Sequence, residues 1–347
     1  MVRFVRDSAG IAWLLLMMSA ASHTDAQTSP ANDHFDFTRM VAHWGEYDSD
    51  DYLPFLDEAK PEVAQVGFYG AHFWGLAQTP HGSGYPAHFP VQGHRECGDW
   101  FEDLNRKIQK RGIKIIGHLN MTFLVGDPDS EEGPRGFFEF YRDRWDETIL
   151  GPKPVQDPAD FLERNRDGSP IIESNYNIGG MQEYWACLRN PHWRQVLKAW
   201  VRAGIARGVD GFIVNYFYRH DCHCSHCVSG FKAYLADRFT EAQLRELFGI
   251  EDLDKHVFDE IVAWHDPDSS SPLRREALHF SQITNQEAFD EVFVEFGRGL
   301  KPNLIVAQWN HIGAFGQISG DERCFLPANM WAPHEDYTWY STGGAAN

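Results

Sequence analysis

Three cysteines within six residues form the densest group of reactive side chains in the sequence, spaced C-H-C-S-H-C over residues 222–227. Cysteines this close together seldom form disulfides with one another without strain. A C-x-C-x-x-C spacing instead brings several thiolates to one point, as in a tetrahedral Zn²⁺ site. Such a site needs a fourth ligand. The sequence offers His223 and His226 nearby and Cys187 at a distance.

The complete set of cysteines leaves two other interpretations open. Six are present, and an even number in an exported protein is typical of disulfides. Free thiols are the other alternative. We favour metal binding, because three of the six are clustered at metal-ligand spacing. They are Cys97, Cys187, Cys222, Cys224, Cys227 and Cys324.

Polar and aromatic side chains recur where short apolar runs end. These runs are rich in branched and aromatic residues, which is typical of buried strands. They span 37–44, 63–69, 113–120, 211–217 and 304–309, with a sixth at 337–342. We expect the side chains at their carboxyl ends to line one substrate-binding cleft. The candidates are Trp44, Tyr69, His72, His118, Asn120, Asn215, Trp309 and His311.

Helical segments separate several of these strands and determine how they can be arranged. Residues 100–111, 193–207 and 272–300 carry apolar side chains at helical spacing. This alternation predicts a parallel sheet with right-handed crossovers. The first strand is not followed by G-x-G-x-x-G, and the chain has no G-x-x-x-x-G-K-[ST] motif, so a nucleotide-binding doubly wound sheet lacks its phosphate loop. We therefore predict an α/β fold of the (β/α)₈ TIM-barrel type over residues 37–347.

Only six strands are predicted, whereas a barrel of this type needs eight. A long excursion occupies residues 121–187, after the third strand. Either the missing strands lie in this excursion, or the barrel continues in a longer protein. We favour the second alternative, because residues 343–347 follow a strand with nothing that would close a fold.

The composition and the first residues restrict partners and location. The formal net charge of −19, without a basic run, argues against a nucleic-acid partner. Aromatic residues make up 14% of the chain, compatible with stacking on sugar rings as well as with filling a large core.

A basic start followed by an apolar stretch at 10–21 is typical of a secretory signal. We place the signal at residues 1–26 and a linker at 27–36, with an uncleaved anchor as the alternative. The mature chain has no other apolar segment long enough to span a membrane. We expect a secreted or periplasmic protein, and a homo-oligomer is compatible with the sequence.

The region from Cys187 to Gly249 resembles glycoside hydrolase family 42 and related hydrolases that carry a β-galactosidase trimerisation domain. The resemblance rests on C-x-C-x-x-C directly after a strand ending Val-Asn-Tyr, and on Cys187-Leu-Arg-Asn-Pro before a long helix. It implies a TIM barrel acting on carbohydrate, with a structural zinc. It also implies that the fourth zinc ligand is Cys187, beside Cys222, Cys224 and Cys227.

One departure from the family concerns catalysis. The family has an Asn-Glu pair at the end of the fourth strand, and here Asn215 is followed by Tyr216. A tyrosine with an ordinary pKa near 10 does not readily protonate a glycosidic oxygen. Glycosidases normally use two carboxyl groups. The candidates nearby are Glu335, before the sixth strand, and Asp221, before the cysteines, with Glu46, after the first strand, as a third.

Three functions compete. The first is an exported glycosidase that cleaves O-glycosidic bonds by paired-carboxylate chemistry. The second is a catalytically inactive relative that binds carbohydrate, which the Tyr216 substitution favours. The third is a zinc hydrolase with His and Asp ligands, which the 17 histidines permit but which lacks any H-x-H or H-E-x-x-H spacing.

Overall fold

The computed structural model describes residues 36–42, 46–68, 78–79, 82–83, 94–131, 133–178, 180–215, 222–258, 271–311, 328–330, 332–337 and 339–341. Contacts divide the chain into two units, Met1–His34 and Phe35–Asn347. All described residues belong to the second unit. No helix among them is long and apolar enough to cross a membrane.

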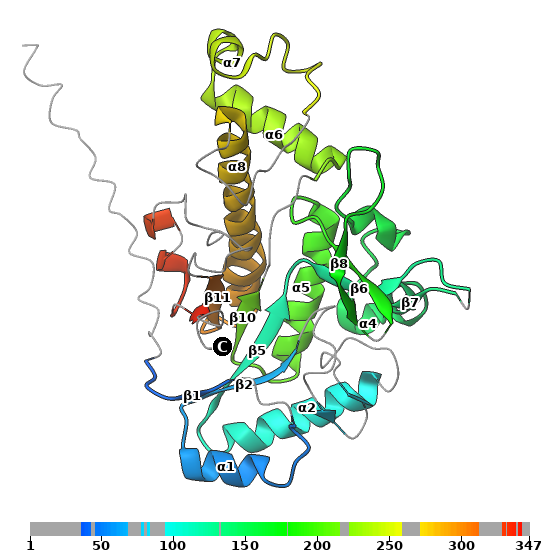
Figure 1. Cartoon of the computed structure of the whole chain (residues 1–347). Coiled ribbons are helices and arrows are strands. Elements are labelled where there is room, and N and C mark those ends of the chain that lie inside the picture. Colours follow the sequence, from blue (N-terminus) through cyan, green and yellow to red (C-terminus); the bar gives the residue numbers. More distant parts are fainter. Residues whose placement is uncertain are drawn as a thin grey trace, which may run out of the picture. The chain divides into compact units, whose positions relative to one another are not determined.

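The main sheet has six described strands, all parallel, in the order β1-β2-β5-β10-β11-β12 (Figure 1). These strands are β1 (Met40–Val41), β2 (Val63–Phe68), β5 (Lys114–Asn120), β10 (Gly211–Asn215), β11 (Ile305–His311) and β12 (Trp339–Ser341). Their order follows the chain without a reversal. A doubly wound sheet reverses at a switch point, whereas barrel strands follow one another. The predicted α/β fold with a parallel sheet is confirmed, and its strand order is that of a barrel.

Side chains alternate between the two faces of this sheet, as the period of a strand requires. One face packs on the helices in the largest core, to which β2 contributes Val66 and β5 contributes Leu119. The other face begins with an apolar layer near the amino ends of the strands. It contains Val63, Ile116, Ile213 and Ile305. We call this second face the inner face, because it is the one that would line a closed barrel.

The excursion after β5 forms a sheet of its own. Its described strands are antiparallel in the order β7-β6-β9-β8. They are β6 (Phe123–Asp127), β7 (Arg135–Gly136), β8 (Ile172–Ile178) and β9 (Met181–Trp185). None of them pairs with the main sheet in the described part of the chain. The alternative that this excursion supplies the missing barrel strands is therefore wrong for the strands described.

The helices that cover the main sheet begin and end at recognisable signals. Helix α5 (Pro191–Ala206) starts after Asn190, whose side chain accepts a hydrogen bond from the His192 amide, and has Pro191 in its first turn. The chain leaves α5 through Gly208, whose φ of 91° favours glycine. The predicted helix at 272–300 is helical throughout, but a π-helical segment interrupts it. Its parts are α8 (Pro272–Phe289), η3 (Asp290–Gly297) and α9 (Arg298–Leu300).

The remaining elements differ in detail from the predicted ranges. The helix predicted at 100–111 is α2 (His94–Gln109), and the one at 193–207 is α5 (Pro191–Ala206). Of the first predicted strand, at 37–44, only β1 is a described strand. The other short elements are α1 (Tyr52–Ala59), β3 (Gln78–Thr79), β4 (Gly82–Ser83), α3 (Phe137–Glu139), η1 (Phe140–Arg144), α4 (Glu147–Leu150), η2 (Pro158–Phe161), η4 (Ala328–Met330) and η5 (Ala332–His334).

A helical lobe follows the cysteine cluster. It consists of α6 (Ser225–Arg238), α7 (Glu241–Phe248) and part of α8, which Figure 1 shows extending from the sheet to α6 and α7. The lobe has its own core, which includes Phe231, Leu235 and Phe280. Cys222, Cys224 and Cys227 therefore lie where the lobe begins.

Candidate metal centre and strand-end site

Two segments distant in sequence bring the four cysteines together. Cys187 lies between β9 and α5, and its amide donates to the Phe161 carbonyl at 2.8 Å. The other three lie at the start of α6, where the His223 amide donates to the Arg164 carbonyl at 2.7 Å. These backbone bonds fix both segments on the chain that leads from η2 to β8.

The four sulfur atoms converge on one point. All lie within 4.8 Å of one another, and Cys187 Sγ lies 3.5 Å from Cys224 Sγ and 3.4 Å from Cys227 Sγ. These cysteines are free, and the two distances exceed a disulfide bond of about 2.05 Å. A tetrahedral zinc with Zn–S bonds near 2.3 Å requires sulfurs about 3.8 Å apart. The cluster thus fits a metal ion, and the fourth member is Cys187, as the resemblance implied.

The pKa values of three cysteines in the cluster are shifted by neighbouring thiols. The pKa of Cys224 is lowered, because the thiols of Cys187, Cys222 and Cys227 hydrogen-bond to its sulfur. Hydrogen bonding with Cys187 raises the pKa of Cys222 and of Cys227 well above the ordinary range. A bound cation would favour the thiolate form of its cysteine ligands.

Arg189 connects the cysteine segment to the helical lobe. Its guanidinium lies 4.5 Å from the ring centroid of Phe280 and donates to Thr284 Oγ1 at 2.9 Å. It also forms an ion pair with Glu287 at 3.1 Å. On α6, Gly230 permits the close approach, because a Cβ there would lie 2.6 Å from Arg189 Nε. This one side chain thus contacts both α6 and α8.

Above the apolar layer, the inner face of the main sheet becomes polar. Gln65 on β2 and His118 on β5 are buried, and Gln65 Nε2 lies 3.2 Å from His118 Nδ1. Asn120, two residues beyond His118 on the same face, is also buried. This polar layer lies toward the carboxyl ends of the strands, where barrel enzymes build their sites. The structure therefore places two predicted binding residues, His118 and Asn120, together.

The other predicted site residues are only partly described. Asn215 and Asn120 are register partners at the ends of β10 and β5, and Trp309 and His311 lie near the end of β11. For these residues of β10 and β11 only the backbone is described. Four further candidates lie outside the described residues: Trp44, Tyr69, His72 and Asp221.

Glu335 lies before β12 and is half-buried. Its Oε2 accepts a hydrogen bond of 3.3 Å from the backbone amide of Gln308 on β11. The next residue, Asp336, accepts from the Val306 amide at 2.7 Å and from Arg298 at 3.0 Å. Both carboxylates therefore bind backbone amides of one strand. The catalytic role of Glu335 stays a prediction, and its contact with β11 is a second, structural role.

Sequence reasoning missed two buried polar residues. Gln65 is a single amide in an otherwise apolar strand, and period-2 alternation from Val63 would have placed it on the inner face. Glu183 on β9 is fully buried and shares a face of that strand with Trp185. Cys187 follows two residues after Trp185. The only signal for Glu183 is the strand-like spacing of Met181 and Trp185, two residues to either side, in an excursion that was not predicted to be a sheet.

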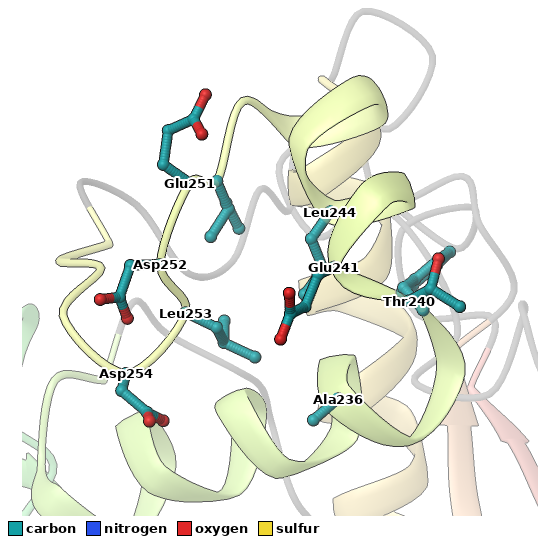
Figure 2. A pocket seen from close by; sticks show the side chains of 10 residues that line it. Ala236, Thr240, Glu241, Leu244, Glu251, Asp252, Leu253 and Asp254 are labelled. Carbon is teal, nitrogen blue, oxygen red and sulfur yellow. The ribbon is translucent and has the colours of Figure 1, made fainter.

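A separate hollow of about 690 Å³ lies in the helical lobe (Figure 2). Glu241 and Leu253 point into it from opposite sides, as Figure 2 shows. Two of its acids are paired, Glu251 with Arg245 and Asp252 with Lys255, each at 2.7 Å. Its lining contains none of the predicted site residues. It consists of Ala236, Phe239, Thr240, Glu241, Leu244, Ile250, Glu251, Asp252, Leu253 and Asp254.

Comparison with known proteins points to one class of enzyme. No family model matches the chain. A β-galactosidase, BgaB of Geobacillus sp. (strain Y412MC61), is 25% identical over 271 residues, which cover 70% of this chain and 37% of that protein. A catalytic mutant of Gan42B, a GH42 β-galactosidase from G. stearothermophilus, has a similar fold, with a TM-score of 0.51 and 15% identity over 88% of this chain and 40% of that chain.

These likenesses confirm the resemblance to family 42 that the cysteine spacing indicated. The structural likeness shows a shared fold. The chain spans only 37% of BgaB and 40% of Gan42B. These likenesses therefore do not by themselves establish the activity of the whole protein.

Proposed function

We propose that this chain is the barrel part of a glycoside hydrolase that cleaves O-glycosidic bonds of an oligosaccharide or polysaccharide. The observation that carries the proposal is the polar layer of Gln65, His118 and Asn120 above an apolar layer on the inner face of the sheet. Buried amides and an imidazole at this place suit the hydroxyl groups of a sugar. The likeness to two β-galactosidases supports the same class of substrate.

The bond would be cleaved by two carboxyl groups, one acting as an acid. Such pairs lie about 5 Å apart in retaining enzymes and about 6.5 to 9.5 Å apart in inverting ones. We propose Glu335 and Asp221 as the pair. The remaining cleft residues would position the sugar ring by stacking and hydrogen bonding.

The cysteine cluster would hold one structural zinc ion. Four thiolates complete a tetrahedral shell and leave no position for a water molecule. The ion would therefore fix the start of α6 relative to Cys187, and it would take no part in the reaction. An exported location is part of the proposal, and the basic and apolar start of the sequence supports it.

The test is a panel of aryl glycosides, including β- and α-galactosides, assayed with the purified chain and with Glu335→Gln and Asp221→Asn. Hydrolysis of one aryl glycoside by the unsubstituted chain, with losses of several orders of magnitude in a variant that stays folded, supports the proposal. Absence of hydrolysis of every member contradicts it.

The second candidate is an inactive relative that binds carbohydrate. The observation in its favour is Tyr216, which follows Asn215 where family 42 has a glutamate. This candidate predicts saturable sugar binding by calorimetry without release of any aryl group. The same panel therefore separates the two functions.

A further inference from the structure

Gln65 lies directly before an irregularity in β2 that fixes its position. Its register partner on β5 is Ile116, and the register of the two strands shifts between Gln65 and Phe68. Gly67 lies inside this shift, and its φ of 79° favours glycine. The Gln65 carbonyl accepts a hydrogen bond of 3.2 Å from Tyr47 Oη. Irregularities of this kind re-aim a side chain, and they are frequent beside active sites.

The side chain of Gln65 reaches past its register partner to His118. Its Nε2 lies 3.2 Å from Nδ1 of His118, which is two residues nearer to the carboxyl end of β5 than Ile116. The nitrogen of a side-chain amide can only donate, so the imidazole nitrogen accepts. Gln65 is fully buried and His118 is 1% exposed. Bulk water therefore does not compete for this bond.

The bond determines which ring nitrogen of His118 carries the proton. A neutral imidazole has one protonated nitrogen and one acceptor. Because Nδ1 accepts from Gln65, the proton is on Nε2. A second proton, on Nδ1, would set two donors against each other, so the arrangement favours the neutral ring. In this tautomer Nε2 is a donor and has no lone pair with which to act as a base.

The position of Gln65 also indicates where the protonated nitrogen lies. The Nδ1 edge of the ring faces β2, at the level of Ile116, so Nε2 is on the edge remote from Gln65. On the other neighbouring strand, β10, the register partner of His118 is Ile213. Ile213 belongs to the apolar layer and offers no acceptor. Nε2 is thus on the side of the ring toward the carboxyl ends of the strands, where barrel enzymes bind their substrates.

We propose that Gln65 is a positioning residue, which holds neutral His118 with its proton on Nε2 so that the imidazole donates a hydrogen bond to a hydroxyl group of the sugar. A hydroxyl oxygen accepts such a bond, whereas the ammonium group of an amino sugar has no acceptor. His118 in this role binds the substrate and transfers no proton. The inference rests on the proposed function for its choice of a sugar as ligand.

The first measurement is nitrogen NMR on the whole chain, labelled with ¹⁵N in its histidine side chains. The pH is 8, above the ordinary histidine pKa of about 6.5. The His118 signals are those that disappear in His118→Gln. We expect a protonated Nε2 and an unprotonated Nδ1. Gln65→Glu should place the proton on Nδ1, because a carboxylate accepts and does not donate. Gln65→Leu, which offers neither donor nor acceptor, should give a mixture of both tautomers.

The second measurement connects the tautomer to the sugar. Calorimetry at the same pH compares the binding of methyl β-galactoside and methyl β-glucoside by the native chain and by Gln65→Glu. We expect binding at least fivefold weaker in the variant, because Nε2 no longer presents a proton. Adding the better-bound sugar should also shift the Nε2 signal of His118 in the native chain. A purely structural role of Gln65 would not produce this shift.

The matched control is Asn105→Asp, which makes the same change from amide to acid at another fully buried position. Asn105 lies on α2, and its Nδ2 donates to the Arg207 carbonyl at 3.0 Å. This variant should keep the native tautomer of His118 and the native affinity for sugar, even where its Tm falls. Thermal unfolding checks that each variant is folded.

Three results overturn the inference: a native chain in which Nδ1 of His118 carries the proton, unchanged sugar binding when Gln65→Glu moves the proton, or no saturable binding of either sugar. The inference and the proposed function can fail separately. Weaker sugar binding in Gln65→Glu, without hydrolysis of any aryl glycoside by the native chain, supports the positioning role and contradicts the hydrolase. Hydrolysis, with equal sugar binding in the native chain and in Gln65→Glu, does the reverse.

Discussion

Cys187 Sγ lies 3.4 Å from Cys227 Sγ, although 40 residues of chain separate the two. The three cysteines at the start of α6 are neighbours by sequence, so only Cys187 depends on the fold for its place in the cluster. It follows β9 of the antiparallel excursion, and Cys222, Cys224 and Cys227 follow β10 of the main sheet. The cluster therefore joins the excursion to the helical lobe, and losing one ligand should affect both.

We predict that Cys187→Ser removes the metal and destabilises the chain. The native chain should contain about one zinc ion, measured by plasma mass spectrometry, and the variant less than a fifth of that amount. The variant should also unfold at a lower temperature, because binding energy of a structural zinc contributes directly to folding. Cys324→Ser, which removes a cysteine that is not one of the four predicted ligands, is the control and should keep its zinc. Full zinc content in Cys187→Ser would contradict the four-cysteine site.

Arg189 offers a test of how the cluster is coupled to the lobe. Arg189→Ala should lower the free energy of unfolding by about 1 to 2 kcal/mol, because it removes the contact with the Phe280 ring and the bond to Thr284. Lysine should restore only part of this, since an ammonium group lacks the planar face that stacks. Urea denaturation measures the free energy of unfolding of Arg189→Ala and of Arg189→Lys. Arg245→Ala, which removes an exposed ion pair with Glu251, is the control and should change stability by less than about 0.5 kcal/mol.

Asp210 directly precedes β10 and joins the carboxyl end of α2, the amino end of β5 and the residue that follows α9. Its carboxylate accepts hydrogen bonds from Gln109, the Ile115 amide and Lys301, each at 3.0 Å. Burial raises the pKa of Asp210, but these bonds and the charge of Lys301 lower it more, and the net pKa lies below the ordinary value. Asp210→Asn should therefore cost about 1 to 3 kcal/mol at pH 7.

The pH dependence of this effect has a definite sign. A carboxylate whose pKa is lower in the folded state stabilises the fold above its unfolded pKa of about 3.9, and the contribution is lost as the pH falls through the folded pKa. The stability difference between the native chain and Asp210→Asn should be constant from pH 7 to about pH 5 and shrink below pH 4. Asp237→Asn, at an exposed position of α6, is the control. A difference that grows on acidification would contradict the argument.

Local signals in the sequence were sufficient for the main sheet but not for the excursion. The apolar spacing at 193–207 and the branched run at 211–217 act on their own segments, so they placed α5 and β10 without knowledge of the rest. The strands β6 and β9 stabilise one another across about 60 residues of chain, and such pairing leaves little local trace. The polar layer was predicted only in part, because local signals identify residues at strand ends better than single residues inside a strand. His118 and Asn120 end a strand, whereas Gln65 lies inside one, where a lone amide resembles an error in the apolar pattern.

The last prediction concerns Glu335, whose carboxylate accepts a hydrogen bond from the Gln308 amide. Glutamine at this position keeps an oxygen that can accept the same bond, but it cannot donate an acidic proton or act as a nucleophile. If Glu335 is one of the two catalytic carboxyl groups, Glu335→Gln should lose at least three orders of magnitude in kcat on the best aryl glycoside, with its Tm within about 2 °C of the native value.

Glu335→Ala completes the comparison, because it removes the acceptor as well and should lower the Tm further, by about 2 to 4 °C for each kcal/mol lost. Unchanged kcat in Glu335→Gln, together with a lower Tm in Glu335→Ala, would make this residue a structural contact of β11 and nothing more. The catalytic pair would then have to include another acid. Glu183, which is fully buried on β9, is the described acid to substitute next.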